Sequence, residues 1–508
     1  MNLISFKKDL RKFRYLQEKE DAEVKAGIKK SSNFNLLFKK YKHLFTKNNI
    51  LELKDILNNV DKEEREKLHN LLFFLIENYV NKKVADLEDK ITKYVNKAKF
   101  RYNNKSYNYS EANLLILEEP NKDKRFEILN STKLILNNIN KLKLKIFNKL
   151  INEFKDLGYN YLEYYLKFKQ IDYFKLEKSL KFFLKATDKS YKVRMSKFLK
   201  KHGLKIYDKG VDFAYVSKSS VDNKYLLKEN LLQLAYNFFN GIGINIKKQK
   251  NIILDLNERK NKTLRAWTHI LKLPSKIRVS VKPVGGFYDY RGLLHELGHA
   301  EHYANVSKDL DFEFSEFHRG YTTTEIYAAL FEFLISNPEF LNAYTKIDNI
   351  GKKQIIEFGY IYKFFLMRRY IGKFIYELKF FTNNLRKLDN NYNEIKKEYK
   401  DFSECYYDIL RKASLIEHQK ESYLTDFDYG FYSAEYNLAW LAEAQLKSYL
   451  IKKLGRYWFK NKDTLLILKD LWKYGNKLSA YEVVRLIGYN YVKVKPLIDY
   501  FNNFKLPK

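Results

Sequence analysis

The stretch Leu294-His295-Glu296-Leu297-Gly298-His299-Ala300 indicates both the fold and the chemistry of this chain. It has the pattern His-Glu-x-x-His within an apolar run, and on a helix this spacing places His295 and His299 on one face, one turn apart. Two imidazoles in this arrangement can bind one divalent metal ion. Catalytic zinc usually has three protein ligands and keeps one position for water, so we expect a zinc site whose third ligand comes from another segment.

Glu296 adjoins the histidine pair and is the predicted general base. Beside a metal ion that polarises water, a carboxylate can accept a proton at neutral pH that it could not remove from free water. The expected reaction is hydrolysis of a peptide bond. The alternative is that the pattern is a structural set of salt bridges, and the small number of histidines, nine in 508 residues, makes this the weaker interpretation.

The spacing of other zinc-peptidase motifs does not identify the third ligand. A metzincin pattern requires Gly at position 302 and His at position 305, where this chain has His302 and Asn305. A thermolysin-like spacing places Glu at position 319, where the chain has Arg319. We interpret His302 as a residue beside the site, because a fourth protein ligand would close the position left for water.

Glu325 is the predicted third ligand. The segment 324–333, Thr-Glu-Ile-Tyr-Ala-Ala-Leu-Phe-Glu-Phe, has apolar residues at helical spacing and places Glu325 on the same side as Glu332, two turns later. Glu332 would then accept an N–H from a ligating histidine and fix its tautomer. Glu313 and Glu316 are alternative ligands nearer in sequence, but they lie in a polar, aromatic connection without helical periodicity.

These segments resemble the thimet oligopeptidase and oligoendopeptidase F family of zinc peptidases, gluzincins in which a helix after the zincin helix carries a Glu ligand. The segment 255–262, Asp-Leu-Asn-Glu-Arg-Lys-Asn-Lys, is similar to the family's Asp-Leu-x-x-Arg-x-x-Lys, and Gly285-Gly286 resembles its Gly-rich turn. The resemblance extends from about residue 145 to residue 450 and is dense between residues 251 and 340. It implies one zinc ion per chain, oligoendopeptidase activity on short peptides, and an N-terminal helical wall opposite the catalytic half.

The resemblance also implies tyrosine hydroxyls that reach the oxyanion of the tetrahedral intermediate. The segment 426–440 combines a glycine-containing turn with closely spaced tyrosines and is similar to the family's Tyr-rich segment. By position, Tyr432 is the first candidate and Tyr436 the second. The histidine that precedes these tyrosines in the family has no counterpart here, where Asp426 lies in that region.

We expect a mainly α fold, a large helical zincin-type body with a small β-sheet beside the active-site helix and a deep cleft. Periodicity predicts N-terminal helices over residues 6–26, 34–45, 51–79, 84–94 and 111–117, and short strands over residues 252–256, 266–270 and 277–282. An edge strand of this sheet can pair with an extended peptide by main-chain hydrogen bonds. We assign residues 1–140 to an N-terminal helical region and residues 141–508 to the catalytic zinc-peptidase region.

The formal net charge of +34 raises the question of an anionic partner such as nucleic acid, but the basic residues are mostly lysines spread along the whole chain. No helix-turn-helix, zinc-finger or RNP pattern accompanies them. We therefore do not favour nucleic acid as a partner. A basic nucleic-acid-binding helical protein is kept as an alternative. A catalytically inactive zincin-fold binding protein is the other alternative, and the oligomeric state stays open.

The cytoplasm is the expected location. The single cysteine, Cys405, allows no intrachain disulfide, and the first residues lead into charged sequence without the apolar core of a signal peptide. No apolar run reaches the roughly 18 residues that a membrane span needs, so we expect no membrane partner.

Overall fold

The computed structural model describes residues 2–387, 401–426 and 428–506. The first part of the chain is helical apart from one short hairpin. Its elements are α1 (Leu3–Lys25), α2 (Phe34–Lys40), α3 (Lys47–Asn58), α4 (Lys62–Lys97), β1 (Lys99–Tyr102), β2 (Lys105–Asn108), α5 (Ala112–Glu118), α6 (Lys122–Ser131) and α7 (Lys133–Asp156).

The remaining part of the chain contains a small sheet between long helices. Its elements are α8 (Tyr161–Lys169), α9 (Tyr173–Lys201), α10 (Gly210–Ser219), α11 (Lys228–Gly241), β3 (Ile252–Asp255), β4 (Trp267–Lys272), β5 (Lys276–Ser280), α12 (Phe287–Ala304), α13 (Phe312–Ser315), α14 (Thr322–Glu332), α15 (Pro338–Tyr344), α16 (Asn349–Lys387), α18 (Phe402–Ser414), α19 (Tyr432–Leu454), α20 (Asp463–Trp472), α21 (Ala480–Leu486) and α22 (Lys495–Asn502).

Three features of the N-terminal part differ from the predicted helices. The helices predicted over residues 51–79 and 84–94 are not separate, because α4 runs without a break through residues 80–83. The prediction of one continuous helix over residues 51–79 is wrong. Asp61 caps a new helix, α4, by accepting a hydrogen bond from the N–H of Glu64 at 2.9 Å. The helical prediction also omits the β1–β2 hairpin. Asn103 and Asn104, with φ angles of 49° and 60°, form its two-residue turn, a conformation that asparagine tolerates.

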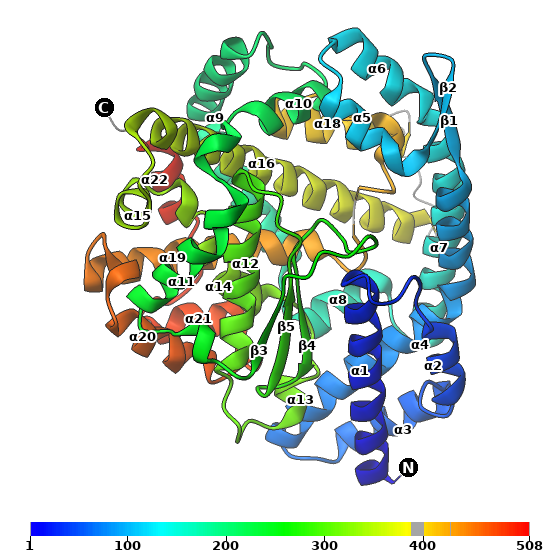
Figure 1. Cartoon of the computed structure of the whole chain (residues 1–508). Helices are drawn as coiled ribbons and strands as arrows, with labels where there is room; N and C mark the ends of the chain where they lie inside the picture. The colour runs from blue at the N-terminus through cyan, green and yellow to red at the C-terminus, as the bar shows by residue number, and fades with distance from the viewer. Residues whose placement is uncertain (1, 388–400, 427, 507–508) are drawn as a thin grey trace.

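The three predicted strands are present and form one sheet in the order β3-β5-β4. β3 pairs with β5 in parallel, and β4 pairs with β5 in the antiparallel direction. β4 is therefore an edge strand. Helix α1 lies beside this edge, and α12 packs against β5 and β4, so the sheet adjoins the helix that carries the histidine motif (Figure 1).

The histidine helix α12 and the predicted ligand helix α14 approach each other closely at Gly298. A Cβ atom at this position would lie 2.7 Å from the Cα of Ala328, so no side chain fits between the two backbones. Helix α14 also packs against α19. The glycine inside the motif thus lets the faces of α12 and α14 meet, with α19 next to them.

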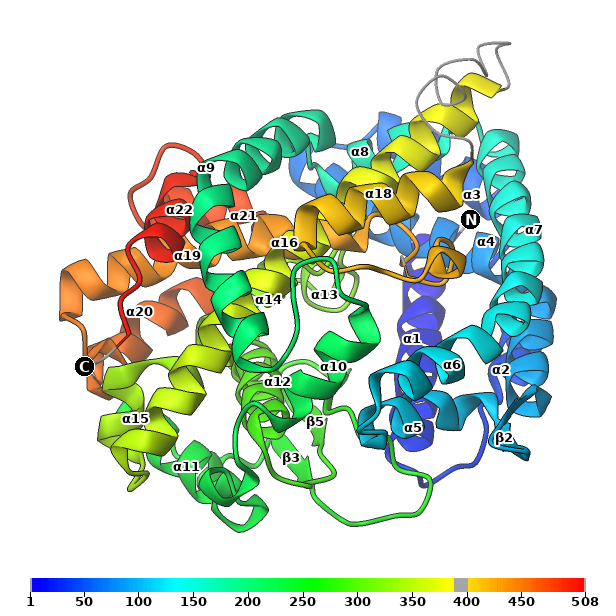
Figure 2. The same ribbon diagram turned by 90° about the horizontal axis from the view of Figure 1, so that it is seen from above.

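The N-terminal helices gather on one side of the molecule, and α15, α20 and α22 lie on the other, with α12 and α14 between them (Figures 1 and 2). The predicted boundary near residue 140 falls within α7, and the division into two regions stays a prediction. Within the described ranges, every helix is too short or too polar to cross a bilayer.

Candidate metal centre

Helix α12 places the two histidines as their spacing predicts. Its N-terminus follows Gly285 and Gly286, whose positive φ angles of 86° and 84° turn the chain into the helix. The Nε2 atoms of His295 and His299 lie 3.2 Å apart. Both side chains are only slightly exposed, at 14% and 12%, so the pair is largely buried.

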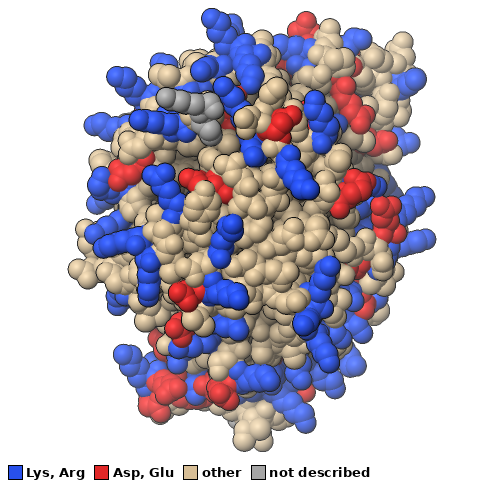
Figure 3. Space-filling view, turned by 60° about the vertical axis from the view of Figure 1, so that its left-hand side comes forward, with Lys and Arg blue, Asp and Glu red and all other residues tan. Residues whose placement is uncertain are grey.

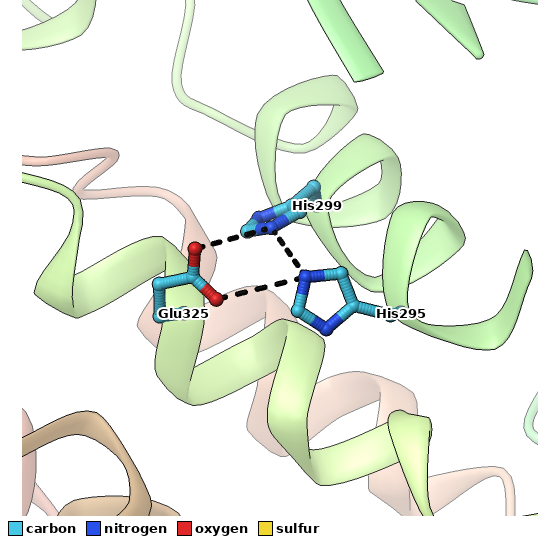
Figure 4. Close-up of side chains that lie close together, drawn as sticks. All are labelled: His295, His299 and Glu325. Atoms are coloured by element: carbon cyan, nitrogen blue, oxygen red, sulfur yellow. Dashed lines mark hydrogen bonds and ion pairs between the residues drawn. The ribbon is translucent and has the colours of Figure 1, made fainter. Parts of the chain in front are cut away.

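Helix α14 brings Glu325 to the histidine pair. Its Oε2 atom lies 3.6 Å from Nε2 of His295, and its Oε1 atom lies 3.8 Å from Nε2 of His299 (Figure 4). One ligand atom from each of the three residues lies within 4.8 Å of the others, so the group could hold a metal ion. Two imidazole nitrogens and a carboxylate oxygen are a donor set that suits zinc and related divalent metals.

The carboxylate of Glu325 also fits this interpretation by its surroundings. The side chain is 3% exposed, and its Oε2 atom has no hydrogen-bond partner among the residues that the structure describes. Burial raises the pKa of Glu325 to about 7, although His295 and Tyr432 oppose the increase. A buried carboxylate oxygen without a partner is costly, and a cation between Glu325 and the histidines would remove that cost.

The outer nitrogens of both histidines have polar neighbours. Nδ1 of His299 lies 2.7 Å from Oγ1 of Thr324, and Nδ1 of His295 lies 3.5 Å from Oε2 of Glu332. Glu332 in turn pairs with Arg291. These contacts leave both Nε2 atoms directed at the candidate metal position, which is the arrangement that orients metal-binding histidines. Of these residues, Glu332 is predicted from the sequence, whereas Thr324 and Arg291 are not.

The charged groups around the two histidines shift one another's pKa values. Burial alone would raise the pKa of Glu332, but Arg291 and His295 lower it to about 2. Burial alone would lower the pKa of His295, but the carboxylate of Glu332 raises it to about 9. Burial and the neighbouring His295 lower the pKa of His299, so its imidazole is neutral. An anionic Glu332 is therefore available to hold the N–H of His295.

Glu296, the predicted general base, lies on the sheet side of α12. It is 8% exposed, and burial raises its pKa. Its backbone carbonyl accepts a hydrogen bond from Oγ1 of Thr268 on β4 at 2.8 Å. This bond ties the catalytic helix to the edge strand at the position of Glu296.

The predicted tyrosines lie at the start of α19. The hydroxyl of Tyr432 donates a hydrogen bond to Oε1 of Glu325 at 2.9 Å, and the hydroxyl of Tyr436 lies 3.3 Å from that of Tyr432. Both tyrosines are thus close to the candidate metal group, with Tyr432 in direct contact with it.

The alternative ligands lie elsewhere. Glu313 forms an ion pair with Lys7 at 2.8 Å, and Glu316 binds Arg11 through both carboxylate oxygens. Both contacts join α1 to the connection around α13.

His302 is fully buried, and its Nε2 lies 3.2 Å from the carbonyl oxygen of Gly475. Burial lowers its pKa to about 3, which indicates a neutral core residue.

Solved structures with this fold include three that cover nearly all of the chain. A candidate peptidase from Chlamydophila abortus has a TM-score of 0.63 at 13% identity, over 99% of this chain and 89% of that chain. A Pyrococcus furiosus carboxypeptidase has a TM-score of 0.53 at 13% identity, over 98% of each chain. A candidate oligoendopeptidase F from Bacillus anthracis str. Ames has a TM-score of 0.53 at 14% identity, over 98% of this chain and 84% of that chain.

No protein-family model matches the sequence, and no curated protein matches it. The structural similarity therefore identifies the fold, which is shared with solved structures described as peptidases. The prediction of a mainly α body with a small sheet beside the motif helix is confirmed.

Proposed function

We propose that the chain is a zinc-dependent metallopeptidase that hydrolyses short peptides in the manner of an oligoendopeptidase. The observation that carries this proposal is the convergence of His295, His299 and Glu325, with ligand atoms within 4.8 Å, in a fold shared with peptidases. These three residues would hold one zinc ion. When bound, zinc supplies Lewis-acid polarisation of water and of the peptide carbonyl.

The remaining roles follow from the groups around this position. Glu296 accepts a proton from the attacking water and passes it to the leaving amine. Tyr432 turns its hydroxyl from Glu325 to the oxyanion of the tetrahedral intermediate, and Tyr436 lies one helical turn behind it. Glu332 and Thr324 hold the outer nitrogens of the two histidines, so the imidazoles keep their orientation through the reaction.

The edge strand β4 is the proposed site for the peptide backbone. Helix α1 already covers part of this edge, because Nη1 of Arg14 donates to the carbonyl oxygen of Ile270 at 3.3 Å. In antiparallel pairing, Thr268 directs its backbone groups to the same side as Ile270. The peptide would therefore pair near Thr268, which is the strand residue bound to the backbone of Glu296.

On one face of the molecule, the distribution of basic residues does not favour nucleic-acid binding. On the face in Figure 3, Lys and Arg are spread among acidic and other residues instead of gathering in one patch. A nucleic-acid-binding surface usually has its basic residues clustered along a groove or helix.

The experiment that tests the proposal is hydrolysis of a quenched short-peptide library by the purified protein, with and without chelator, beside the variant Glu296→Gln. We expect chelator-sensitive cleavage that falls by several orders of magnitude in the variant while zinc is retained. Zinc binding without cleavage would favour the inactive zincin-fold binding protein. A chain without zinc that binds nucleic acid in a salt-sensitive way would favour the other alternative.

A further inference from the structure

Glu435 is a fully buried carboxylate in the first turn of α19, between the two tyrosines of the candidate site. Its Oε1 atom forms an ion pair with Lys169, the last residue of α8. Its Oε2 atom accepts hydrogen bonds from the backbone N–H of Tyr321 and, at 3.2 Å, from that of Thr322. One side chain thus joins α8, α14 and α19.

The contacts with Tyr321 and Thr322 hold the start of the ligand helix. N–H groups at a helix N-terminus have no partner within the helix, and a carboxylate there also stabilises the helix dipole. The carbonyl oxygen of Tyr321 accepts the N–H of Glu325 at 3.0 Å, so the two residues are one turn apart. Fixing Tyr321 therefore fixes the turn that carries the proposed ligand.

The same carboxylate also connects this turn of α14 to the segment of α19 that carries the proposed oxyanion donor. Tyr432 precedes Glu435 on α19, and its ring packs edge-on against Tyr321 with centroids 5.5 Å apart. Lys169 also donates to the carbonyl oxygen of Gly430 at 2.6 Å, just before α19 begins. Lys169 and Glu435 thus hold the starts of both helices, from which Glu325 and Tyr432 meet.

The close fit around Glu435 supports a specific role for this carboxylate. A Cβ atom at Gly320 would lie 2.5 Å from its Oε2 atom, so any side chain at position 320 would displace the carboxylate from its present place. The ion pair itself is nearly dry, with side chains of Lys169 and Glu435 exposed by 8% and 0%. Ion pairs this deeply buried do not by themselves make a fold more stable, because desolvation offsets much of the attraction.

We propose that Glu435 is a positioning residue that fixes the positions of Glu325 and Tyr432 relative to each other at the candidate metal centre. The inference rests on the proposed function of that centre. Glu435 acts through the backbone N–H groups of Tyr321 and Thr322 and touches neither the metal position nor Tyr432's hydroxyl. Lys169 neutralises the carboxylate of Glu435 and connects it to α8.

The test separates the hydrogen-bond acceptor from the charge. Lys169→Met/Glu435→Gln removes both charges but keeps an amide oxygen that can accept from Tyr321, whereas Lys169→Met/Glu435→Leu also removes the acceptor. Both pairs remove the two charges of this ion pair together, so neither leaves Lys169 or Glu435 as an unpaired buried charge, and both are expected to fold. Arg125→Met/Asp212→Leu is a matched control, because Arg125 and Asp212 form another buried ion pair, between α6 and α10.

Metal affinity, the visible spectrum of the cobalt-substituted protein, and kcat and KM are measured for each folded variant. The pair with Leu should lose about 10- to 100-fold in metal affinity and in kcat relative to the pair with Gln, with KM unchanged, and its cobalt spectrum should shift. The control pair should change the unfolding temperature only. Equal metal affinity, spectrum and kcat in the Gln and Leu pairs would overturn the inference, even with an active wild type. A wild type that binds no metal would instead overturn the proposed function, and the inference with it.

Discussion

The hydroxyl of Tyr432 donates a hydrogen bond to Oε1 of Glu325 at 2.9 Å, across 107 positions of sequence. The residue proposed as oxyanion donor is therefore in direct contact with a proposed metal ligand. A phenol has one hydrogen to donate, so Tyr432 must release Glu325 when it turns to an oxyanion. With a cation already held by Glu325, the loss of this hydrogen bond would cost little, because the cation would stabilise the freed carboxylate oxygen.

We expect Tyr432→Phe to lower kcat by about 10²- to 10³-fold, the usual effect of removing one oxyanion donor, while zinc content stays as in the wild type. Steady-state hydrolysis of a short peptide and metal analysis of the same sample measure both. Tyr436→Phe is the control, because its hydroxyl contacts that of Tyr432, 3.3 Å away. The control should lose less, and equal losses would contradict the assignment of the donor to Tyr432.

Glu325→Ala is expected to remove most of the bound metal, because two histidines without a third protein ligand bind zinc weakly. Metal per chain after dialysis against a weak chelator is the measurement. Glu316→Ala and Glu313→Ala are the controls, since these carboxylates pair with Arg11 and Lys7 on α1. Full zinc occupancy in Glu325→Ala would contradict the assignment of the third ligand to Glu325.

The unfolding free energy should depend on pH through Glu377. This carboxyl is fully buried and accepts hydrogen bonds from the N–H of Phe431 and the hydroxyl of Ser433, which hold the start of α19. Burial raises its pKa to about 8. Between about pH 4.5 and pH 8 the folded state keeps a proton that the unfolded chain releases, so stability falls as pH rises, by up to about 1.4 kcal/mol per pH unit.

Urea unfolding at several pH values between 5 and 8 measures this slope. Glu377→Gln replaces the protonated carboxyl with a neutral group of the same shape, so the slope should decrease in the variant. An unchanged slope would show that other groups cause the pH dependence.

The local part of the site could be predicted from sequence because helical geometry fixes it. A spacing of four residues places His295 and His299 on one face, and a spacing of seven places Glu325 and Glu332 on another. The strands were also predictable, because alternation changes the period of the pattern between residues 252 and 280. In the N-terminal part, the same approach misses the break at Asp61, where a single capping residue ends the apparent continuity of the helix.

Contacts between distant segments produce no recognisable pattern in the local sequence. Lys169 and Glu435 are 266 positions apart, and Arg291 and Glu332 are 41 apart, so neither pair follows a helical or strand period. Thr324 adjoins the predicted ligand, yet only the packing of α14 on α12 places its hydroxyl at Nδ1 of His299. The groups that orient the site therefore depend on tertiary structure, whereas those that define its chemistry lie in short motifs.

The close packing of α12 on α14 makes Gly298 a specific requirement of the motif helix. A methyl group at this position would meet the Cα of Ala328 at 2.7 Å and its backbone N at 3.2 Å, and a backbone cannot move aside as a flexible side chain can. Gly298→Ala should therefore force the helices apart. We expect it to lower the unfolding free energy by about 1–3 kcal/mol, the usual cost of overpacking, and to weaken metal binding because Glu325 would move away from the histidines.

Gly292 on the same helix provides the matched control, because a Cβ atom there would have no neighbour within 4 Å among the described residues. Gly292→Ala should stabilise the protein by about 0.5–1 kcal/mol through higher helix propensity, with metal affinity unchanged. Denaturant unfolding and metal titration of both variants give the comparison. If Gly298→Ala matched Gly292→Ala in both measurements, the contact between α12 and α14 would not determine the distance between Glu325 and the two histidines.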